Sequence, residues 1–225
     1  MKKYNITSFH PIYYILLLVL ISPIYAILNQ STAGAVDVTI GLDDHIPFIK
    51  EWVVPYLLWY PFIYGMLIYL CFVDRKLYYH ALSSMIIGKL ICFVIYFFWQ
   101  STVPRPEVVG NDIFANLMRF VYSTDQPVNC LPSIHVLTTF VIMMVAFQRK
   151  EQNKWEYAFV TLFGSLIILS TLFTKQHAIL DATAGMLLAF FVLAAVQLVT
   201  SKIHLFQVNP FKAKHAKELK IVKNK

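Results

Sequence analysis

Six stretches of the sequence are almost entirely apolar, and polar segments separate them. A helix needs about 20 residues, at about 1.5 Å each, to cross a hydrocarbon core about 30 Å thick. The fourth stretch is short for a full crossing, so we expect its helix to start inside the preceding segment, Cys130–Ser133. The six stretches cover roughly 11–28, 53–73, 80–100, 134–148, 155–173 and 180–201. This pattern predicts an all-α, polytopic membrane protein built as a bundle of six transmembrane helices.

The composition supports this prediction. Hydrophobic residues make up 58% of the 225 residues and charged residues only 14%, against about 25% charged in ordinary soluble domains. Neither a soluble protein with a single core nor a disordered chain has such a composition. No Gly/Ser-rich linker or internal repeat divides the chain. We therefore expect one membrane-embedded domain over residues 1–225, with a basic cytoplasmic tail at 202–225.

The distribution of Lys and Arg predicts the orientation of the spans. The N-terminus, residues 74–79, residues 149–154 and the tail together hold 14 of these cations, and the other three connections hold four. Positively charged connections stay in the cytoplasm. Both termini should therefore be cytoplasmic, in a multi-pass protein of the cell membrane, with loops 29–52, 101–133 and 174–179 facing outward.

Two segments allow other interpretations. Lys2 and Lys3 precede an apolar run, as in a cleavable signal peptide, but the run is long and the cleavage site poor, so we favour a retained span. The lysine-rich tail resembles a nucleic-acid-binding segment. Anionic lipid attracts a polybasic segment next to a span equally well, so we expect a membrane partner and no nucleic acid. The sequence does not indicate an oligomeric state.

The cysteines do not indicate a metal site or a disulfide framework. There are three of them, an odd number, and they form no CxxC pair. We expect neither a metal nor another cofactor.

Three polar segments that are far apart in sequence should meet at the outer ends of the spans. They are Pro104–Pro106, Cys130–His135 and Lys175–Asp181. The parity of the crossings places all three on one side of the membrane. A catalytic site can be built there from Arg, Ser, Lys, Asp and two His. The alternative is a set of unrelated loop residues.

His177 and Asp181 are the strongest candidates. They are four residues apart and share one face if the segment is helical. A carboxylate that binds one imidazole nitrogen leaves the other free to attack or to accept a proton. The alternative is a hydrated loop histidine beside a capping aspartate.

The other candidates suit an anion. Ser133 and His135 follow Pro132, which is typical of the first turn of a helix, where free amides and the dipole favour negative charge. Arg105 stands between two prolines and carries a guanidinium suited to phosphate. Lys175 breaks the charge pattern of the outer loops. A plain helix start and lipid headgroup contacts are the alternatives. Arg119 and Lys89 are weaker candidates.

These residues resemble the type 2 phosphatidic acid phosphatase superfamily, whose signature is K-x6-R-P, P-S-x-H and S-R-x5-H-x3-D. The second motif is Pro132–Ser133–Ile134–His135. The third has Ser170, His177 and Asp181 at the family spacing. The first survives only as Arg105–Pro106.

Three positions depart from the signature. Phe98 stands where the family has lysine, Thr171 where it has arginine, and Ile134 where glycine is frequent. These three departures, together with the sequences of the segments Tyr122–His135 and Thr174–His177, make the chain similar to the branch of the superfamily that contains inositol phosphorylceramide synthases. That resemblance implies possible transfer of a phosphate-bearing headgroup between lipids, with Lys175 or Arg119 replacing a missing cation.

The resemblance implies a metal-free, two-step mechanism on a lipid phosphate. His177 would be the nucleophile, Asp181 would orient it, and His135 would be the general acid and then the base. Arg105, Ser133 and Lys175 would bind the phosphoryl oxygens. We therefore expect a lipid phosphatase that acts through a phosphohistidine at the extracytoplasmic face.

Three alternatives stay open. The first is the phosphotransferase, in which a hydroxyl replaces water as the acceptor. The second is a lipid transporter or scramblase without chemistry, which inverted repeats and broken helices at mid-membrane would favour. The third is a serine hydrolase that uses Ser133, His177 and Asp181, which the absence of a G-x-S-x-G motif disfavours.

Overall fold

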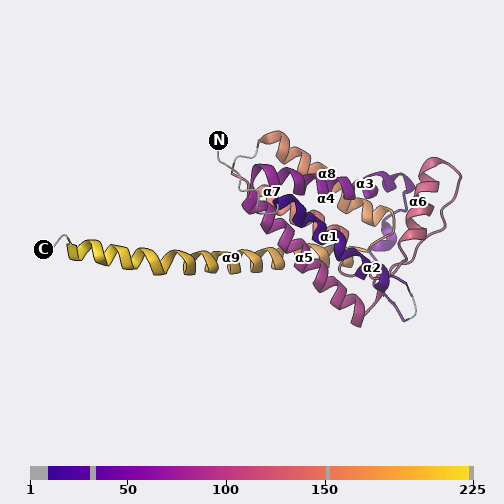
Figure 1. The fold of residues 1–225 in the computed structure, drawn as a ribbon. Coiled ribbons are helices and arrows are strands. Elements are labelled where there is room, and N and C mark those ends of the chain that lie inside the picture. Colours follow the sequence, from indigo (N-terminus) through magenta and orange to yellow (C-terminus); the bar gives the residue numbers. More distant parts are fainter. Residues whose placement is uncertain (1–9, 31–33, 151–152, 223–225) are drawn as a thin grey trace.

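The structure, a computed structural model, describes residues 10–30, 34–150 and 153–222. Helices dominate it, as Figure 1 shows. They are η1 (Pro11–Ile15), α1 (Leu16–Leu20), α2 (Ser22–Leu28), η2 (Asp43–His45), η3 (Lys50–Trp52), α3 (Val53–Leu57), α4 (Trp59–Val73), α5 (Arg75–Phe98), α6 (Ile113–Thr124), α7 (Ile134–Phe147), α8 (Lys154–Phe173) and α9 (Ile179–Val222). Two-residue strands β1 (Val36–Asp37) and β2 (Ser101–Thr102) pair in parallel.

Among the described residues, five helical segments are long and apolar enough to cross a membrane. They are Pro11–Leu28, Lys50–Val73, Arg75–Phe98, Lys154–Phe173 and Ile179–Ser201. The prediction of a helical membrane protein is therefore confirmed at this level. The first segment is part of the bundle, since Leu18 is buried in the main hydrophobic core and Tyr78 donates a hydrogen bond to the Pro11 carbonyl, Oη to O 2.6 Å.

The predicted fourth span is a shorter helix than a full crossing needs. Helix α7 has 14 residues, or about 21 Å of rise. The expectation that it starts inside Cys130–Ser133 is wrong, because it starts at Ile134 with Ser133 as its N-cap. Its apolar character reflects burial inside the protein: Val136, Leu137, Val141 and Ile142 are fully enclosed.

Helix α7 is the centre of the bundle, and α4, α5, α8 and α9 pack around it. Gly185 of α9 is one reason why the helices approach so closely. A Cβ atom there would lie 2.8 Å from the Ser133 carbonyl oxygen and 3.3 Å from the Leu137 amide, so only hydrogen fits. The N-terminal ends of α7 and α9 therefore lie side by side.

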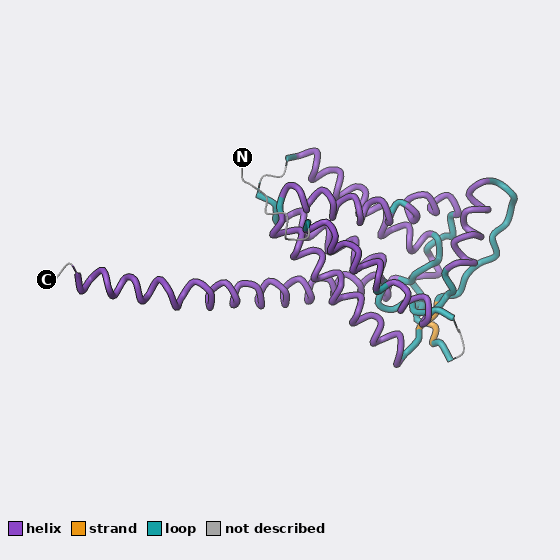
Figure 2. The backbone as a smooth tube through the Cα atoms, in the orientation of Figure 1, coloured by secondary structure: helices purple, strands orange, loops and turns teal. Residues whose placement is uncertain are grey.

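Loops and α6 gather at one end of the bundle, which we call the loop end (residues 34–52, 101–133 and 174–178). The loops are teal in Figure 2, and the helices among them are purple. The strand pair connects the first two of these loops, and the Thr102–Val128 bridge joins the two ends of the second loop. Ile49 N–H donates to the Phe173 carbonyl at the C-terminal end of α8, N to O 2.9 Å. The three predicted outer loops are thus joined at one end. At the other extreme, the backbone of α9 continues well beyond the bundle (Figure 1).

Candidate active site

His177 and Asp181 form a buried pair at the start of α9. The His177 Nδ1 atom lies 3.3 Å from Asp181 Oδ2, and the Ala178 amide donates to the same oxygen, N to O 2.9 Å. The Asp181 side chain is fully buried and His177 is 8% exposed. In the described part of the chain, His177 Nε2 has no hydrogen-bond partner. The carboxylate can therefore fix the ring and leave Nε2 available for chemistry.

His135 faces this pair from the first turn of α7. The centroids of the His135 and His177 rings are 5.7 Å apart. Tyr56 and Trp59 pack against the His135 ring, with centroid distances of 4.8 and 4.3 Å. Trp59 is held in turn by a hydrogen bond from its Nε1 to Thr138 Oγ1, 2.9 Å. Aromatic packing thus fixes the orientation of the second imidazole.

Ser133 connects the two helices that carry the histidines. Its hydroxyl oxygen caps α7 by accepting from the Val136 amide, N to O 3.3 Å. Its own amide donates to the main-chain carbonyl of Asp181, N to O 3.1 Å. Tyr96 of α5 donates to the adjacent Pro132 carbonyl. These contacts hold the start of α7 at a fixed distance from the start of α9.

Arg105 is held next to His177 by hydrogen bonds to main-chain carbonyls and to the side chain of the neighbouring residue Gln176. It donates to the carbonyls of Asp125, Nη1 to O 2.6 Å, and Tyr122, Nη1 to O 3.4 Å, and to the Gln176 side chain. Its guanidinium stacks on the Tyr122 ring at 4.5 Å. Its Nε is buried and has no partner in the described residues. Through Gln176, Arg105 supports the turn that carries His177.

Lys175 and Arg119 lie further from the histidines. Lys175 adopts a left-handed backbone conformation with φ 52°, and its ammonium donates to the Asp43 carbonyl, Nζ to O 2.9 Å. Arg119 donates to the Val108 and Gly110 carbonyls. Neither lines the cavity described next.

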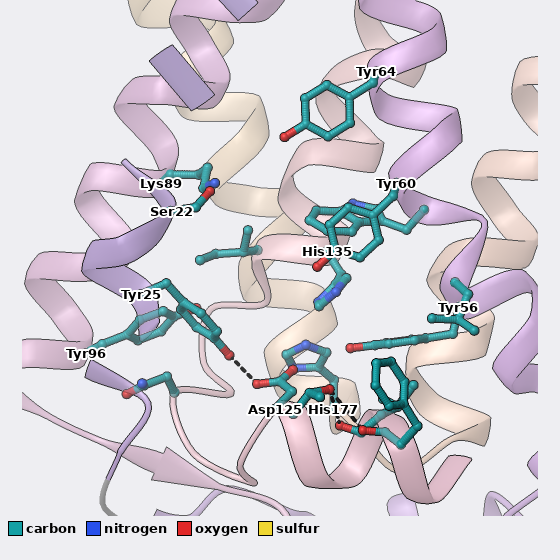
Figure 3. A pocket seen from close by; sticks show the side chains of 17 residues that line it. Ser22, Tyr25, Tyr56, Tyr60, Tyr64, Lys89, Tyr96, Asp125, His135 and His177 are labelled. Carbon is teal, nitrogen blue, oxygen red and sulfur yellow. Dashed lines mark hydrogen bonds between the residues drawn. The ribbon is translucent and has the colours of Figure 1, made fainter. Parts of the chain in front are cut away.

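A cavity of about 470 Å³ opens between the two histidines and the surrounding helices (Figure 3). Its walls come from α2 to α7 and from the segments that precede α7 and α9. Residues lining it are Ser22, Tyr25, Tyr56, Leu57, Trp59, Tyr60, Tyr64, Lys89, Tyr96, Phe120, Val121, Thr124, Asp125, Asn129, Ile134, His135 and His177. It therefore combines an aromatic wall with a few ionisable groups, as ligand sites commonly do.

Sequence reasoning missed two polar members of this cavity. Asn129 is 2% exposed, has φ 61°, and neither atom of its amide group has a partner in the described residues. Asp125 accepts a hydrogen bond from the Tyr25 hydroxyl, Oη to Oδ1 2.8 Å (Figure 3). Both stand in the segment before Pro132. Both belong to the segment Tyr122–His135 that resembles the inositol phosphorylceramide synthase branch, but that resemblance assigned them no role, because their roles depend on how the loop folds.

Burial dominates the electrostatics of the loop end. It raises the pKa of the Asp125 carboxyl above its ordinary value, although the Tyr25 hydrogen bond and Arg105 oppose the shift. It also raises the pKa of Tyr122 to about 12 and that of the Cys130 thiol by more. Burial thus disfavours the charged forms of the Cys130 thiol and the Asp125 carboxyl, and less negative charge at these two groups suits an anionic ligand.

Three side chains can be considered as metal ligands. One ligand atom from each of Cys130, His177 and Asp181 lies within 4.8 Å of the other two, and all three residues are buried. A metal there would take Cys130 as the thiolate, which burial disfavours. Two of these residues, His177 and Asp181, already form the hydrogen-bonded pair described above.

The geometry defines a helical membrane protein whose site carries two imidazoles, one of them oriented by a carboxylate. The family model of the PAP2 superfamily matches residues 77–204, more than half of the chain. The chain belongs to the PAP2 superfamily, whose members are phosphoester hydrolases or phosphotransferases. Membership suggests that the protein acts on a lipid phosphate in a membrane. Searches of curated proteins and of solved structures each returned no match.

Proposed function

We propose that this protein is a membrane phosphatase that hydrolyses a lipid phosphomonoester or diphosphate through a phosphohistidine. The observation that carries the proposal is the His177–Asp181 pair, which faces His135 across a cavity at the loop end. All three side chains lie within residues 77–204, the range that the family model matches, and they stand at the positions of the P-S-x-H and S-R-x5-H-x3-D motifs in the sequence. The reaction needs no metal in this proposal, because the imidazoles and fixed donors supply all the groups that it uses.

In the first step, His177 Nε2 attacks phosphorus while Asp181 holds Nδ1–H. The new bond is N–P, and the bond that breaks joins phosphorus to the leaving oxygen. His135 gives its proton to that oxygen. In the second step His135 takes a proton from water, the water oxygen attacks phosphorus, and the N–P bond breaks. Inorganic phosphate leaves and His177 is restored.

The transition state places negative charge on the phosphoryl oxygens, so fixed donors should contribute most of the rate enhancement. We assign this role to Arg105 through its free Nε, and to Ser133 with the first amides of α7. The unpartnered amide of Asn129 is a further donor at the cavity wall. Lys175 would act at longer range, because its ammonium is bonded to the Asp43 carbonyl.

We place the site at the extracytoplasmic face of the cell membrane, with both termini in the cytoplasm and with the buried helix α7 as the fourth of six crossings in chain order. The charge distribution supports this orientation: Arg149, Lys150 and Lys154 lie at the end of the bundle away from the site. Lys2 and Lys3 lie outside the described residues. A lipid can then keep its phosphate at the loop end and its tails along the aromatic wall.

Phosphoryl or headgroup transfer to a lipid hydroxyl is the second candidate. The replacement of two family cations favours this candidate. Phe98, at the position of the lysine, is 79% exposed at the end of α5. Thr171, at the position of the arginine, is fully buried, and its carbonyl accepts hydrogen bonds from the Gln176 and His177 amides. This is the departure that resembles inositol phosphorylceramide synthases. With fewer cations the site would bind inorganic phosphate more weakly, which suits a reaction in which the phosphate stays esterified to a lipid.

Purified protein in detergent, incubated with a panel of lipid phosphates and EDTA, tests the proposal. Phosphate release that survives chelation and disappears in His177→Ala supports the phosphatase. Product appearing only with an added lipid alcohol, and resolved by mass spectrometry, supports transfer. Activity that EDTA abolishes and Zn²⁺ restores contradicts the metal-free mechanism. Lipid translocation retained by His177→Ala indicates a transporter, and ester cleavage lost in Ser133→Ala a serine hydrolase.

A further inference from the structure

Lys89 is a cation inside the bundle that the proposed mechanism does not use. It lies in α5, a candidate membrane span, is 9% exposed and lines the cavity. No hydrogen bond or ion pair joins its ammonium to any residue that the structure describes. An unpaired charge is costly within a membrane, and such residues usually serve function. Figure 3 shows the side chain extending from α5 toward the cavity.

The position of Lys89 relative to the histidines follows from α5 and α7. Tyr96, also in α5, reaches the Pro132 carbonyl at the loop end. Lys89 comes seven residues earlier, which is two turns or about 10.5 Å further into the bundle on the same face. Its neighbour Gly88 packs against Leu137, two residues beyond His135. In Figure 3, His135 accordingly lies between His177 and Lys89.

Among the side chains that the structure describes, none provides a counter-ion to Lys89. Asp125 is the carboxylate that lines the cavity, and it is engaged with Tyr25. Ser22, which also lines the cavity, donates its proton to the Leu18 carbonyl, Oγ to O 2.8 Å. Tyr60 and Tyr64 of α4 add hydroxyl groups to the opposite wall of the cavity. These groups suit an anion supplied by a ligand.

The proposed chemistry determines where such an anion belongs on the substrate. His177 attacks phosphorus from one side, so the leaving oxygen lies roughly in line on the opposite side, where His135 protonates it. Whatever is bonded to that oxygen continues past His135 toward Lys89. In a phosphomonoester this group is an uncharged alkyl chain, whereas in a diphosphate it is a second phosphate.

We propose that Lys89 binds the second phosphate of a lipid diphosphate and makes this class the preferred substrate. The inference rests on the proposed function. The N–P bond forms at the terminal phosphorus, the bridging O–P bond breaks, and the lipid monophosphate leaves with the bridging oxygen and the proton of His135. Lys89 neutralises the charge that develops on this leaving group. Lys89 also replaces, at a different depth, one of the two cations that the signature motifs lack here.

The test compares an isoprenoid diphosphate with the monophosphate of the same tail in mixed micelles, as initial rates of the first phosphate released. We expect Lys89→Met to lower kcat/KM for the diphosphate about 10- to 100-fold, the loss of one charge-assisted contact, and for the monophosphate less than about threefold. Lys89→Arg should keep most of the diphosphate activity. Lys154→Met is the matched control, because Lys154 is exposed at the start of α8, away from the cavity.

A binding measurement guards against a misfolded variant. Pyrophosphate should raise the Tm of the wild-type protein more than inorganic phosphate does, and Lys89→Met should abolish this difference while eluting as a single species in detergent. Equal losses on both substrates, or none on the diphosphate, would overturn the role of Lys89 and leave the phosphatase standing. No phosphate release from either substrate by the wild type would overturn the proposed function and this inference with it.

Discussion

Among the single residues of the cavity, Asn129 is the most open to a direct test. Its amide is buried, has no partner in the described residues and points to a need for a ligand. Its left-handed backbone restricts the choice of variant, since a residue such as leucine would be strained at φ 61°. Glycine removes the amide and tolerates the conformation.

We predict that Asn129→Gly lowers kcat for phosphate release about 100-fold, as for a donor to a developing oxyanion, with a smaller change in KM. Asn129→Asp should be worse, because its carboxylate repels the phosphoryl oxygens. Steady-state kinetics on the lipid phosphate measures both. Wild-type kcat in Asn129→Gly would remove the residue from the site.

Asp125 predicts how stability depends on pH. Burial raises its pKa above the ordinary value of 3.8, so between that value and the folded pKa the folded protein holds a proton that the unfolded chain has lost. The free energy of unfolding therefore falls as pH rises through this window. Asp125→Asn lacks this term but can still accept the Tyr25 hydrogen bond.

We expect the Tm of the wild type, relative to Asp125→Asn, to fall as the pH rises above about 4. Thermal unfolding of both proteins in the same detergent and buffers measures the difference, and groups common to both cancel. A Tm difference that does not vary with pH contradicts a raised pKa at Asp125.

The contact between the first turns of α7 and α9 sets the distance between the two histidines. Gly185 permits that contact, because a Cβ would meet the Ser133 carbonyl oxygen at 2.8 Å and the Val136 Cβ at 3.3 Å. Backbone atoms cannot move aside as a flexible side chain can. A substituent at Gly185 must therefore push Ser133 and His135 away from His177.

We predict that Gly185→Ala costs about 1–3 kcal/mol of stability, as overpacking does, and at least about tenfold in kcat. Gly65→Ala is the control, since nothing lies within 4 Å of its Cβ position in α4. Thermal unfolding and initial rates test the pair. Equal behaviour of the two variants would mean that helix spacing does not limit the chemistry.

Sequence patterns predicted the helices and the meeting of distant motifs, because apolar runs and crossing parity are properties of the chain itself. The sequence patterns failed to predict features that depend on the conformation of a loop. The start of α7 was misplaced, since Cys130–Ser133 is apolar enough to continue a helix but forms the turn that caps it. The expected role of Lys175 at the phosphate stays a prediction, and no sequence pattern anticipated the bond between its ammonium and the Asp43 carbonyl.

Lys89 shows that the sequence also does not predict how a helix is rotated about its axis. Its place in the third apolar run was evident, but only the rotation of α5 decides whether the ammonium meets lipid, a helix carbonyl or the cavity. That rotation follows from contacts such as Tyr96 with Pro132 and Gly88 with Leu137. No single sequence pattern encodes them.

For the whole molecule, the account requires the loop end to face away from the cytoplasm. The three cysteines are buried, so single introduced cysteines report on topology with little background. Val109 in the loop end and Trp155 at the start of α8 suit this purpose, being 75% and 74% exposed.

We predict that a membrane-impermeant maleimide labels Val109→Cys in intact cells and labels Trp155→Cys only after permeabilisation. Gel shift of the tagged protein measures labelling, with the unsubstituted chain as the control. The reverse pattern would place the site in the cytoplasm and contradict the proposed orientation.

Trapping the phosphoenzyme tests the central claim most directly. Protein mixed with lipid labelled in its terminal phosphate, and quenched within one turnover, should carry label that is stable in alkali, labile in acid and located on the peptide containing His177. His177→Gln should carry none, and His135→Ala should retain its label longer because water is activated slowly. Label on Ser133, or undiminished turnover in His177→Gln, would contradict the account.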